Sequence, residues 1–363
     1  MKKLILLATL ASALFASCQK NDNLAPSTIS GTRSNALIVP VRPPIDPTLL
    51  TDVYVVGTYT ANSEYSSAAY WKNGTLVDLG QNGSLAHGIV VSGNNIYVAG
   101  QAIQSGNPNA FQAAYWLNGT EVDLSYASIT HYSSRAFAIA LKGTDVYVVG
   151  DVTNVDNNTS YAMIWKNGVA TNLAYNSYNS GATSIAIRND TVLVAGYSSN
   201  ASIPSIGTYW INNTAHLVRT GAGPSSTSGV IFDNSGNFYI SGNLNNSISN
   251  TGVYWYNGIY QYILSSPVSV SNTSGITFSG GSIYIAGQAN NTAHVGQASY
   301  WQNGTYNVAE IGSSMALDIQ FAGSVKYVLT YQYPTGGYYR NGVFTSIPNC
   351  GGEKICIIQH ILL

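Results

Sequence analysis

Residues 68–79 read AAYWKNGTLVDL, and this stretch decides the fold because its pattern recurs along the chain. An aromatic residue, one variable residue and Asn-Gly or Asn-Asn return at intervals of 38 to 49 residues. The copies are YWKNG at 70–74, YWLNG at 115–119, IWKNG at 164–168, YWINN at 209–213, YWYNG at 254–258, YWQNG at 300–304 and YYRNG at 338–342. A single copy would suggest a sugar-binding tryptophan, whereas seven copies indicate a structural unit.

Two further motifs keep step with the first. A segment of the IYVAG type precedes each copy, at 53–57, 96–100, 146–150, 192–196, 238–242, 283–287 and 326–330. In six units, a small residue, two variable residues and isoleucine come earlier still. Each of these isoleucines lies seven residues before the IYVAG-type segment: Ile89, Ile139, Ile185, Ile231, Ile276 and Ile319. The internal spacing of the unit is therefore constant.

Each unit reads as four short strands, which we call A (small-x-x-Ile), B (IYVAG type), C (ending at the tryptophan) and D (after Asn-Gly). Asn-Gly is the strongest short hairpin signal, because both positions of a type I′ turn adopt positive φ. Four-stranded repeats of about 40–50 residues are typical of propeller blades. Residues 51–363 are therefore predicted to form an all-β, seven-bladed β-propeller of antiparallel blades. Seven aromatic residues are predicted to pack the blades: Trp71, Trp116, Trp165, Trp210, Trp255, Trp301 and Tyr339.

The first blade lacks an A strand of its own, so a terminal strand is expected to close the ring. The corresponding register position falls on Asp46, within the proline-rich run VRPPIDP. Residues 352–355, GEKI, fit small-x-x-Ile and are followed by apolar residues, which favours closure by the C-terminus. The alternative is residues 36–39, ALIV, joined to strand B by a longer loop.

The N-terminus has the pattern of an export signal. Lys2 and Lys3 precede an apolar run at 4–15, which is too short to span a bilayer. The stretch LFASC resembles a bacterial lipoprotein signal, which implies cleavage after residue 17 and lipidation of Cys18, although Phe15 departs from the usual aliphatic residue. Plain secretion with cleavage nearby is the alternative. Residues 18–50 are expected to act as a tether, since prolines stiffen the segment and no strand pattern persists.

The other two cysteines, Cys350 and Cys356, form either a disulfide, as an oxidising compartment allows, or two free thiols. The five histidines and these cysteines show no metal-ligand spacing. Neither a metal nor a cofactor is therefore predicted.

The YW-x-NG and IYVAG blocks resemble those of uncharacterised Bacteroidota lipoproteins built from such repeats. More distantly, they are similar to kelch blades, which also pair a glycine-ended second strand with a downstream Tyr and Trp. The kelch double glycine is absent, so this resemblance implies the propeller architecture only. Together with the lipoprotein signal, the resemblance implies an exported protein anchored to the cell envelope, at the outer membrane and with either side exposed.

Composition excludes several partners. Only 8% of the residues are charged, against about a quarter in an average protein, and the net charge is −1. No long-range field therefore favours nucleic acid or an anionic membrane. Membrane contact is expected only through the lipid anchor.

In a propeller, the A–B and C–D turns share one face, and the B–C and D–A loops share the other. Here the first set is short and uniform, while the second varies in length and content. Binding residues usually lie on variable loops held by a rigid scaffold. Tyrosine with Ser, Asn and Gly suits recognition, although these rings equally suit packing on the blade below. The candidate ligand-binding residues of the D–A loops are Tyr126, His131, Tyr132, Tyr175 and Tyr178.

The function predicted from this pattern is non-catalytic binding of a glycan or a protein partner through the loop-rich face. An extracellular carbohydrate-active enzyme is the first alternative. Asp318 replaces a small or apolar residue of strand A and would supply a lone acid, and His131, Tyr132 and Arg135 would suit proton abstraction. Neither set forms a catalytic constellation, so no catalytic residue is assigned. A purely structural scaffold is the second alternative.

Overall fold

The computed structural model describes residues 52–60, 66–80, 83–104, 107–124, 126, 131–173, 179–199, 205–218, 224–245, 250–264, 270–293, 295–310, 312–332, 335–347 and 355–362. At 107–109, 260–261 and 355–362 it describes the backbone only. Cys18, the tether, the rival strand at 36–39, Tyr175, Tyr178 and Cys350 lie outside these residues. Within them, no helix is long and apolar enough to cross a membrane.

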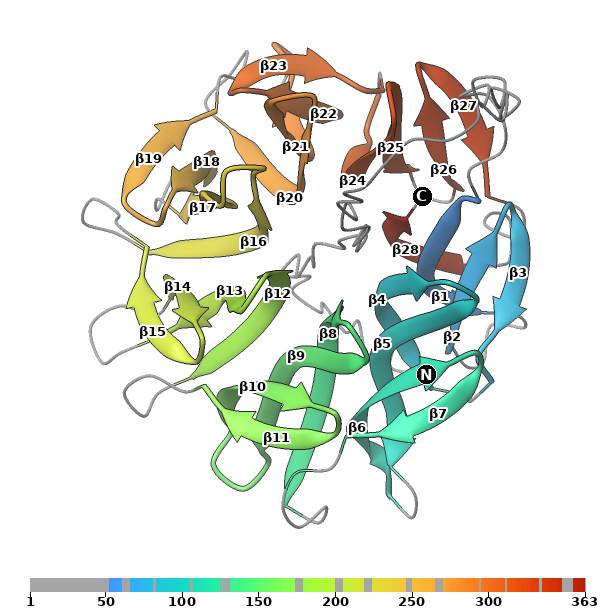
Figure 1. Cartoon of the computed structure of the whole chain (residues 1–363). Coiled ribbons are helices and arrows are strands. Elements are labelled where there is room, and N and C mark those ends of the chain that lie inside the picture. The colour runs from blue at the N-terminus through green and yellow to red at the C-terminus, as the bar shows by residue number, and fades with distance from the viewer. Residues whose placement is uncertain are drawn as a thin grey trace, which may run out of the picture.

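The described residues form 28 strands in seven four-stranded antiparallel sheets, arranged as a ring (Figure 1). The seven-bladed β-propeller predicted from the repeats is confirmed. Blade 1 consists of β28(Ile355–Leu362), β1(Tyr54–Thr60), β2(Ser66–Lys72) and β3(Thr75–Asp78). Blade 2 consists of β4(Leu85–Ser92), β5(Asn95–Gln104), β6(Asn107–Leu117) and β7(Thr120–Asp123). Blade 3 consists of β8(Tyr132–Lys142), β9(Asp145–Asn154), β10(Thr159–Lys166) and β11(Val169–Asn172).

Blades 4 and 5 are β12(Ser180–Arg188), β13(Thr191–Ser198), β14(Ile206–Ile211) and β15(Thr214–Leu217); then β16(Ser225–Phe232), β17(Phe238–Asn245), β18(Asn250–Tyr256) and β19(Tyr260–Ile263). Blades 6 and 7 are β20(Ser271–Ser279), β21(Ser282–Asn290), β22(Gly296–Gln302) and β23(Thr305–Val308); then β24(Met315–Ala322), β25(Val325–Gln332), β26(Thr335–Arg340) and β27(Val343–Ser346). The first strand of each blade lies at the inside of the ring and the last at its rim (Figure 1).

The ring is closed by β28, which pairs antiparallel with β1 and completes blade 1. Closure by the C-terminus, preferred over residues 36–39, is thus confirmed, but the expected register is wrong. Ile361 lies opposite Val55, as Ile89 lies opposite Val98 in blade 2. Ile355 instead begins the ladder, opposite Thr60, because the strand runs on to Leu362.

The Asn of the repeated motif has two structural roles. All seven asparagines adopt positive φ, between 46° and 51°, as a type I′ turn requires. Each side-chain carbonyl also accepts the backbone N–H that begins strand B; in blade 2, Ile96 donates to Asn118 Oδ1 at 2.9 Å. The same contact recurs from Val53 to Asn73, Val146 to Asn167, Val192 to Asn212, Phe238 to Asn257, Ile283 to Asn303 and Lys326 to Asn341.

Each inner strand carries a β-bulge, directly after the residue that pairs with the last residue of the B motif. The bulge brings a carbonyl of strand A onto the glycine that ends the B motif. A Cβ at Gly150 would overlap the carbonyl oxygen of Arg135, and one at Gly100 would overlap that of Leu85. This close approach favours glycine, which ends six of the seven B motifs, whereas blade 7 has Thr330 at the same position.

The six tryptophans are buried, with at most 1% of each residue exposed. The hydrophobic clusters that contain them span neighbouring blades. Trp210 of blade 4 packs with Val149 and Ile164 of blade 3 and with Ile185 of its own blade. Trp71 packs with blade 7 residues such as Leu317, at the junction where the ring closes. Tyr339 takes the equivalent position in blade 7 but is only half-buried.

A row of buried serines joins consecutive blades, and we call it the serine seam. In blade 4, the Ser180 hydroxyl accepts the Ala162 backbone N–H of blade 3 at 2.9 Å. Six blades carry such a serine, two residues before the residue that precedes the bulge of strand A: Ser84, Ser134, Ser180, Ser225, Ser271 and Ser314, with distances of 2.8 to 3.0 Å. In β28, the backbone register places Cys356 at the equivalent position, opposite Tyr59.

Candidate functional site

The two variable sets of loops meet on one face, which we call the loop face. The backbone carbonyl of His131, which precedes the A strand β8, accepts the backbone N–H of Val155, in the B–C loop of the same blade, at 2.9 Å. The tight turns lie at the other ends of the strands, where Asn118 Nδ2 of the C–D turn donates to Asn95 Oδ1 of the A–B turn at 2.9 Å. This confirms the wiring expected of propeller blades.

Two of the tyrosines predicted on the loop face, Tyr126 and Tyr132, take part in packing. Tyr126 and Tyr132 contact each other edge-to-face, with ring centroids 5.5 Å apart. Both are half-buried and pack against the hydrophobic core of blades 1 to 3. The structure therefore brings these two residues together, with part of each ring turned to the blade below.

His131 lies beside this pair but faces solvent. Its Nδ1 lies 2.8 Å from Asp156 Oδ2, and both side chains are more than half exposed. The B–C loop around Asp156 satisfies its own backbone, because Asn154 Oδ1 accepts the Asp156 N–H at 2.9 Å and Asn157 Oδ1 accepts the Thr159 N–H at 3.1 Å. Among the described residues, no group of three His, Cys, Asp or Glu side chains is placed to hold a metal.

Asp318 is not placed as a catalytic acid. Its residue exposure is 0%, and its Oδ1 accepts the backbone N–H of Ile319 at 2.8 Å. A Cβ at Gly275 of blade 6 would come within 2.7 Å of the same oxygen. The carboxylate is thus enclosed between β20 and β24, so the suggestion that it serves as a lone acid in the channel is wrong.

The charged pair Arg135–Asp151 joins β8 to β9 near the loop face. The two residues are direct register partners. Arg135 Nε donates to Asp151 Oδ1 at 3.0 Å, and Nη2 donates to Oδ2 at 2.6 Å, which is a bidentate geometry. The Asp151 side chain is 1% exposed, whereas that of Arg135 is 39% exposed. A buried carboxylate therefore holds a guanidinium that solvent reaches.

This pair interrupts the repeat. The same two register positions hold uncharged residues in the other six blades: Leu85 and Gln101, Gly181 and Tyr197, Ser226 and Asn243, Asn272 and Gln288, Met315 and Tyr331, and Ile357 and Thr58. The blade architecture thus forms without charges here. A residue that departs from the repeat in one blade is a stronger candidate for function than one that recurs in all.

Aromatic side chains surround the pair. The guanidinium carbon of Arg135 lies 5.1 Å from the ring centroid of Phe137, the bulged residue of β8, and the Phe137 ring contacts that of His87 at 5.3 Å. Burial, with Asp151 nearby, raises the pKa of Tyr197 in the next blade to about 12. Tyr197 therefore stays neutral, and its ring covers Gly181.

The two charges shift each other's titration in opposite senses. Burial raises the pKa of Asp151, and the adjacent guanidinium acts against that shift. For Arg135, burial acts to lower the pKa, but Asp151 outweighs it and the net shift is upward. The guanidinium is therefore a permanent cation. The carboxylate that balances its charge is buried, so its ionised form is less favourable than it would be in water.

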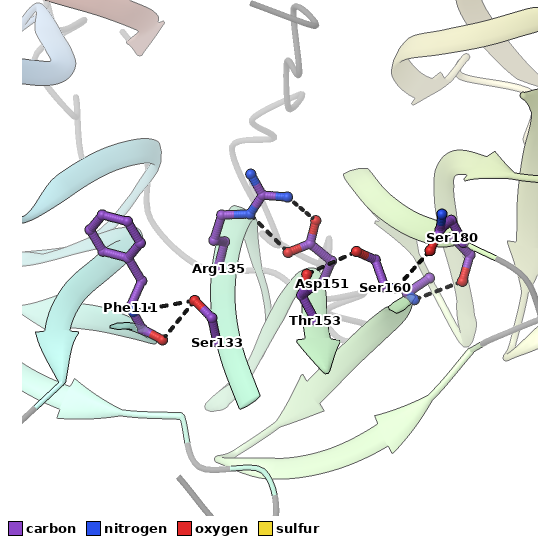
Figure 2. A network of polar contacts seen from close by, with 9 residues as sticks. Phe111, Ser133, Arg135, Asp151, Thr153, Ser160 and Ser180 are labelled. Atoms are coloured by element: carbon purple, nitrogen blue, oxygen red, sulfur yellow. Dashed lines mark hydrogen bonds and ion pairs between the residues drawn. The ribbon is translucent and has the colours of Figure 1, made fainter. Parts of the chain in front are cut away.

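Hydroxyl and amide groups flank this pair on blade 3 and its neighbours (Figure 2), and we call the set the polar belt: Ser133, Arg135, Asp151, Thr153, Ser160 and Asn179. Thr153 and Ser160 join hydroxyl to hydroxyl at 2.8 Å. The Ser160 N–H donates to Asn179 Oδ1 at 2.9 Å. The Ser133 hydroxyl contacts the backbone of Phe111 in blade 2. The belt thus reaches from blade 2 to blade 4 with one cation at its centre.

Sequence reasoning named Arg135 only beside His131 and Tyr132, and it missed Asp151. The structure does not show these three side chains acting together, because His131 pairs with Asp156 and Arg135 with Asp151. Aligning the blades residue by residue would have singled out Asp151, since it directly follows the glycine of its B motif. What the sequence lacked was the strand register that sets Arg135 opposite it.

Comparison with known proteins adds support for the fold. No protein-family model matches the chain, and no curated protein matches it at a significant level. Among solved structures, the chain is similar to a puromycin-hydrolyzing peptidase of Mycobacterium tuberculosis, with a TM-score of 0.51 and 10% sequence identity. The match covers 80% of this chain and 53% of the peptidase chain, so this chain matches about half of its length. At that identity the likeness concerns the propeller fold alone.

Proposed function

We propose that the protein is an exported cell-envelope lipoprotein whose propeller binds a glycan, without catalysing a reaction, at the polar belt on the loop face. One observation carries the proposal: the Arg135–Asp151 pair replaces neutral residues at a single blade. Because six blades fold without this pair, its retention is better explained by a ligand than by stability. Lipid attachment at Cys18 would hold the binding face at the membrane surface.

The surroundings of the pair suit a sugar. Hydroxyl and amide groups such as Thr153, Ser160 and Asn179 donate and accept hydrogen bonds without adding charge. Tyr126 and Tyr132 supply aromatic surface on the same face of the same region. Glycans present this combination of hydroxyl groups and apolar C–H faces, which favours them over a charged partner surface.

The carboxylates at this site favour binding over catalysis. Asp151 is buried and held by both of its oxygens, and Asp156 contacts His131. A general acid or base must reach the proton that it transfers, and a glycosidase uses two carboxylates that flank the bond. The distant likeness to a peptidase rests on the shared fold and does not argue for hydrolysis.

The test is a glycan array probed with the lipid-free chain from residue 19 onward. We expect retention of a restricted set of glycans, with intact chain length after prolonged incubation. A double variant Thr153→Val with Ser160→Ala should weaken retention, while Thr214→Val at the rim of blade 4 should not. Retention of no glycan would overturn the proposal and leave a protein partner or a scaffold role, and shortened glycans would restore the enzyme alternative.

A further inference from the structure

We propose that the glycan bound at the polar belt is acidic, and that a uronate carboxylate pairs with the outer edge of the Arg135 guanidinium. This inference rests on the proposed function and names the chemical class of its ligand. It follows from which nitrogen atoms of Arg135 the protein already uses and which it leaves to solvent.

A guanidinium has five N–H donors arranged along two usable edges. Asp151 occupies the edge formed by Nε and Nη2, at 3.0 and 2.6 Å. The outer edge, formed by Nη1 and the second hydrogen of Nη2, meets no acceptor among the described residues. In Figure 2, the nitrogen that points away from Asp151 has no dashed line to any of the residues drawn.

The guanidinium is held in place before any ligand arrives. Asp151 fixes its plane through two bonds, and Phe137, which is 4% exposed, lies against it. A side chain fixed in this way loses little conformational entropy on binding. The outer edge is therefore a prepared hydrogen-bonding fork rather than a mobile surface arginine.

The fork offers donors only. The Arg135 side chain is 39% exposed and carries no acceptor, while the Asp151 side chain is 1% exposed, so a ligand does not reach its carboxylate. A partner must therefore bring two adjacent acceptor oxygens. A carboxylate matches this edge in shape and charge, and such bidentate contacts are about twice as strong as neutral ones.

The local charge does not oppose an anion. A carboxylate on the outer edge lies next to the guanidinium, with Asp151 on the guanidinium's far side, so attraction to the nearer charge exceeds repulsion from the farther one. Asp156 is engaged by His131, whose Nδ1 lies 2.8 Å from Asp156 Oδ2, and Tyr197 is neutral. The uncharged hydroxyl and amide groups of the belt remain for the sugar ring.

The experiment compares short oligomers of galacturonate and of mannuronate with the same oligomers after reduction of their carboxyl groups, using calorimetry on the chain from residue 19 onward. We expect at least one acidic oligomer to bind about ten- to a hundredfold more tightly than its reduced form, as loss of a charge-assisted pair requires. Arg135→Lys keeps the cation but removes the fork, so it should abolish most of that preference. Arg188→Lys, at the opposite end of an inner strand, is the matched control and should retain it.

The outcomes separate the two proposals. If reduced oligomers bind as well as acidic ones, or if Arg135→Lys leaves the preference unchanged, the acidic-ligand inference is overturned while glycan binding stands. If neither form binds and the array is empty, both fall. The wild-type comparison of acid with reduced oligomer needs no variant, so it decides the question even where Arg135→Lys fails to fold.

Discussion

At the scale of single residues, the asparagine of each C–D turn shows why one residue type recurs seven times. Glycine would accept the positive φ, and several side chains would accept a hydrogen bond, but asparagine does both at this position. The sequence predicted the turn from Asn-Gly. It did not predict the bond to the first N–H of strand B, because that contact depends on the distance between two strands.

Substituting Asn118 separates the two roles. Asn118→Gly keeps the backbone conformation and loses the bond to Ile96, whereas Asn118→Ala loses the bond and also strains a φ of 51°. We expect the free energy of unfolding to fall by about 1 kcal/mol for glycine and about 2–3 kcal/mol for alanine. Urea unfolding measures both, and equal losses would contradict the strain contribution.

Asp151 links stability to pH. Its pKa is raised above the ordinary 3.8 by burial, so the protonated form favours the folded state; that contribution is present below pH 3.8 and lost as the pH rises through the folded pKa. Asparagine does not ionise, so the Asp151→Asn variant does not lose stability in this way as the pH rises. We therefore expect the variant to gain stability relative to wild type between about pH 3.5 and pH 7. Unfolding curves at both pH values check the sign, and a difference independent of pH would contradict it.

Removing the cation of the same pair should lower the stability of the protein instead of raising it. Arg135→Gln leaves a buried carboxylate without its cation, which typically costs about 3–5 kcal/mol at neutral pH. The cost should shrink as the pH falls, because protonation removes the unpaired charge. Loss of stability by the same amount at pH 4 and pH 7 would show that packing against Phe137, rather than charge, explains the effect.

At the scale of the strand, the serine seam shows what a periodic pattern can hide. The spacing small-x-x-Ile predicts strand A, but that pattern does not include the serine that comes before the small residue. Its role is visible only when two blades are side by side, since its hydroxyl reaches the C strand of the preceding blade. A pattern within one repeat predicts that repeat, whereas contacts between repeats need the assembled ring.

Ser180→Ala tests the seam. The substitution leaves the Ala162 N–H buried without its acceptor, so we expect a loss of about 1–3 kcal/mol in the free energy of unfolding. Ser92→Ala, on an exposed position of β4, is the control and should change stability by less than about 0.5 kcal/mol. Equal effects of the two variants would remove the serine from the account of blade packing.

At the scale of the whole molecule, the fold was predictable because the motif of one blade occurs seven times in the sequence. Seven copies of one motif fix the number of blades, and constant spacing fixes the strands within each. The candidate site was less predictable for the same reason: it consists of departures from the repeat, such as Asp151, which gain meaning only from strand register. The register of β28 could not be predicted either. Ile355 ends a small-x-x-Ile pattern in the sequence, but in the structure Ile361 takes the position opposite Val55.

Removing β28 should open the ring. A chain ending at residue 354 loses seven register pairs with β1 and leaves that strand as an exposed edge. We expect the melting temperature to fall by about 10 °C or more and the protein to associate. Size-exclusion chromatography with thermal unfolding measures both effects. Deleting residues 1–50 instead should leave both unchanged, and a stable monomeric truncation at 354 would contradict closure by β28.

The pairing of β28 with β1 also orders events in time. Blades 2 to 7 are each built from neighbouring stretches of chain, so each can form soon after it is synthesised. Blade 1 cannot, since its inner strand emerges after the other 27 strands. Until β28 is synthesised, one edge of β1 has no strand to pair with and can mispair with another nascent chain. A chaperone that shields the early strands would therefore act on the beginning of the chain, although the missing partner is at its end.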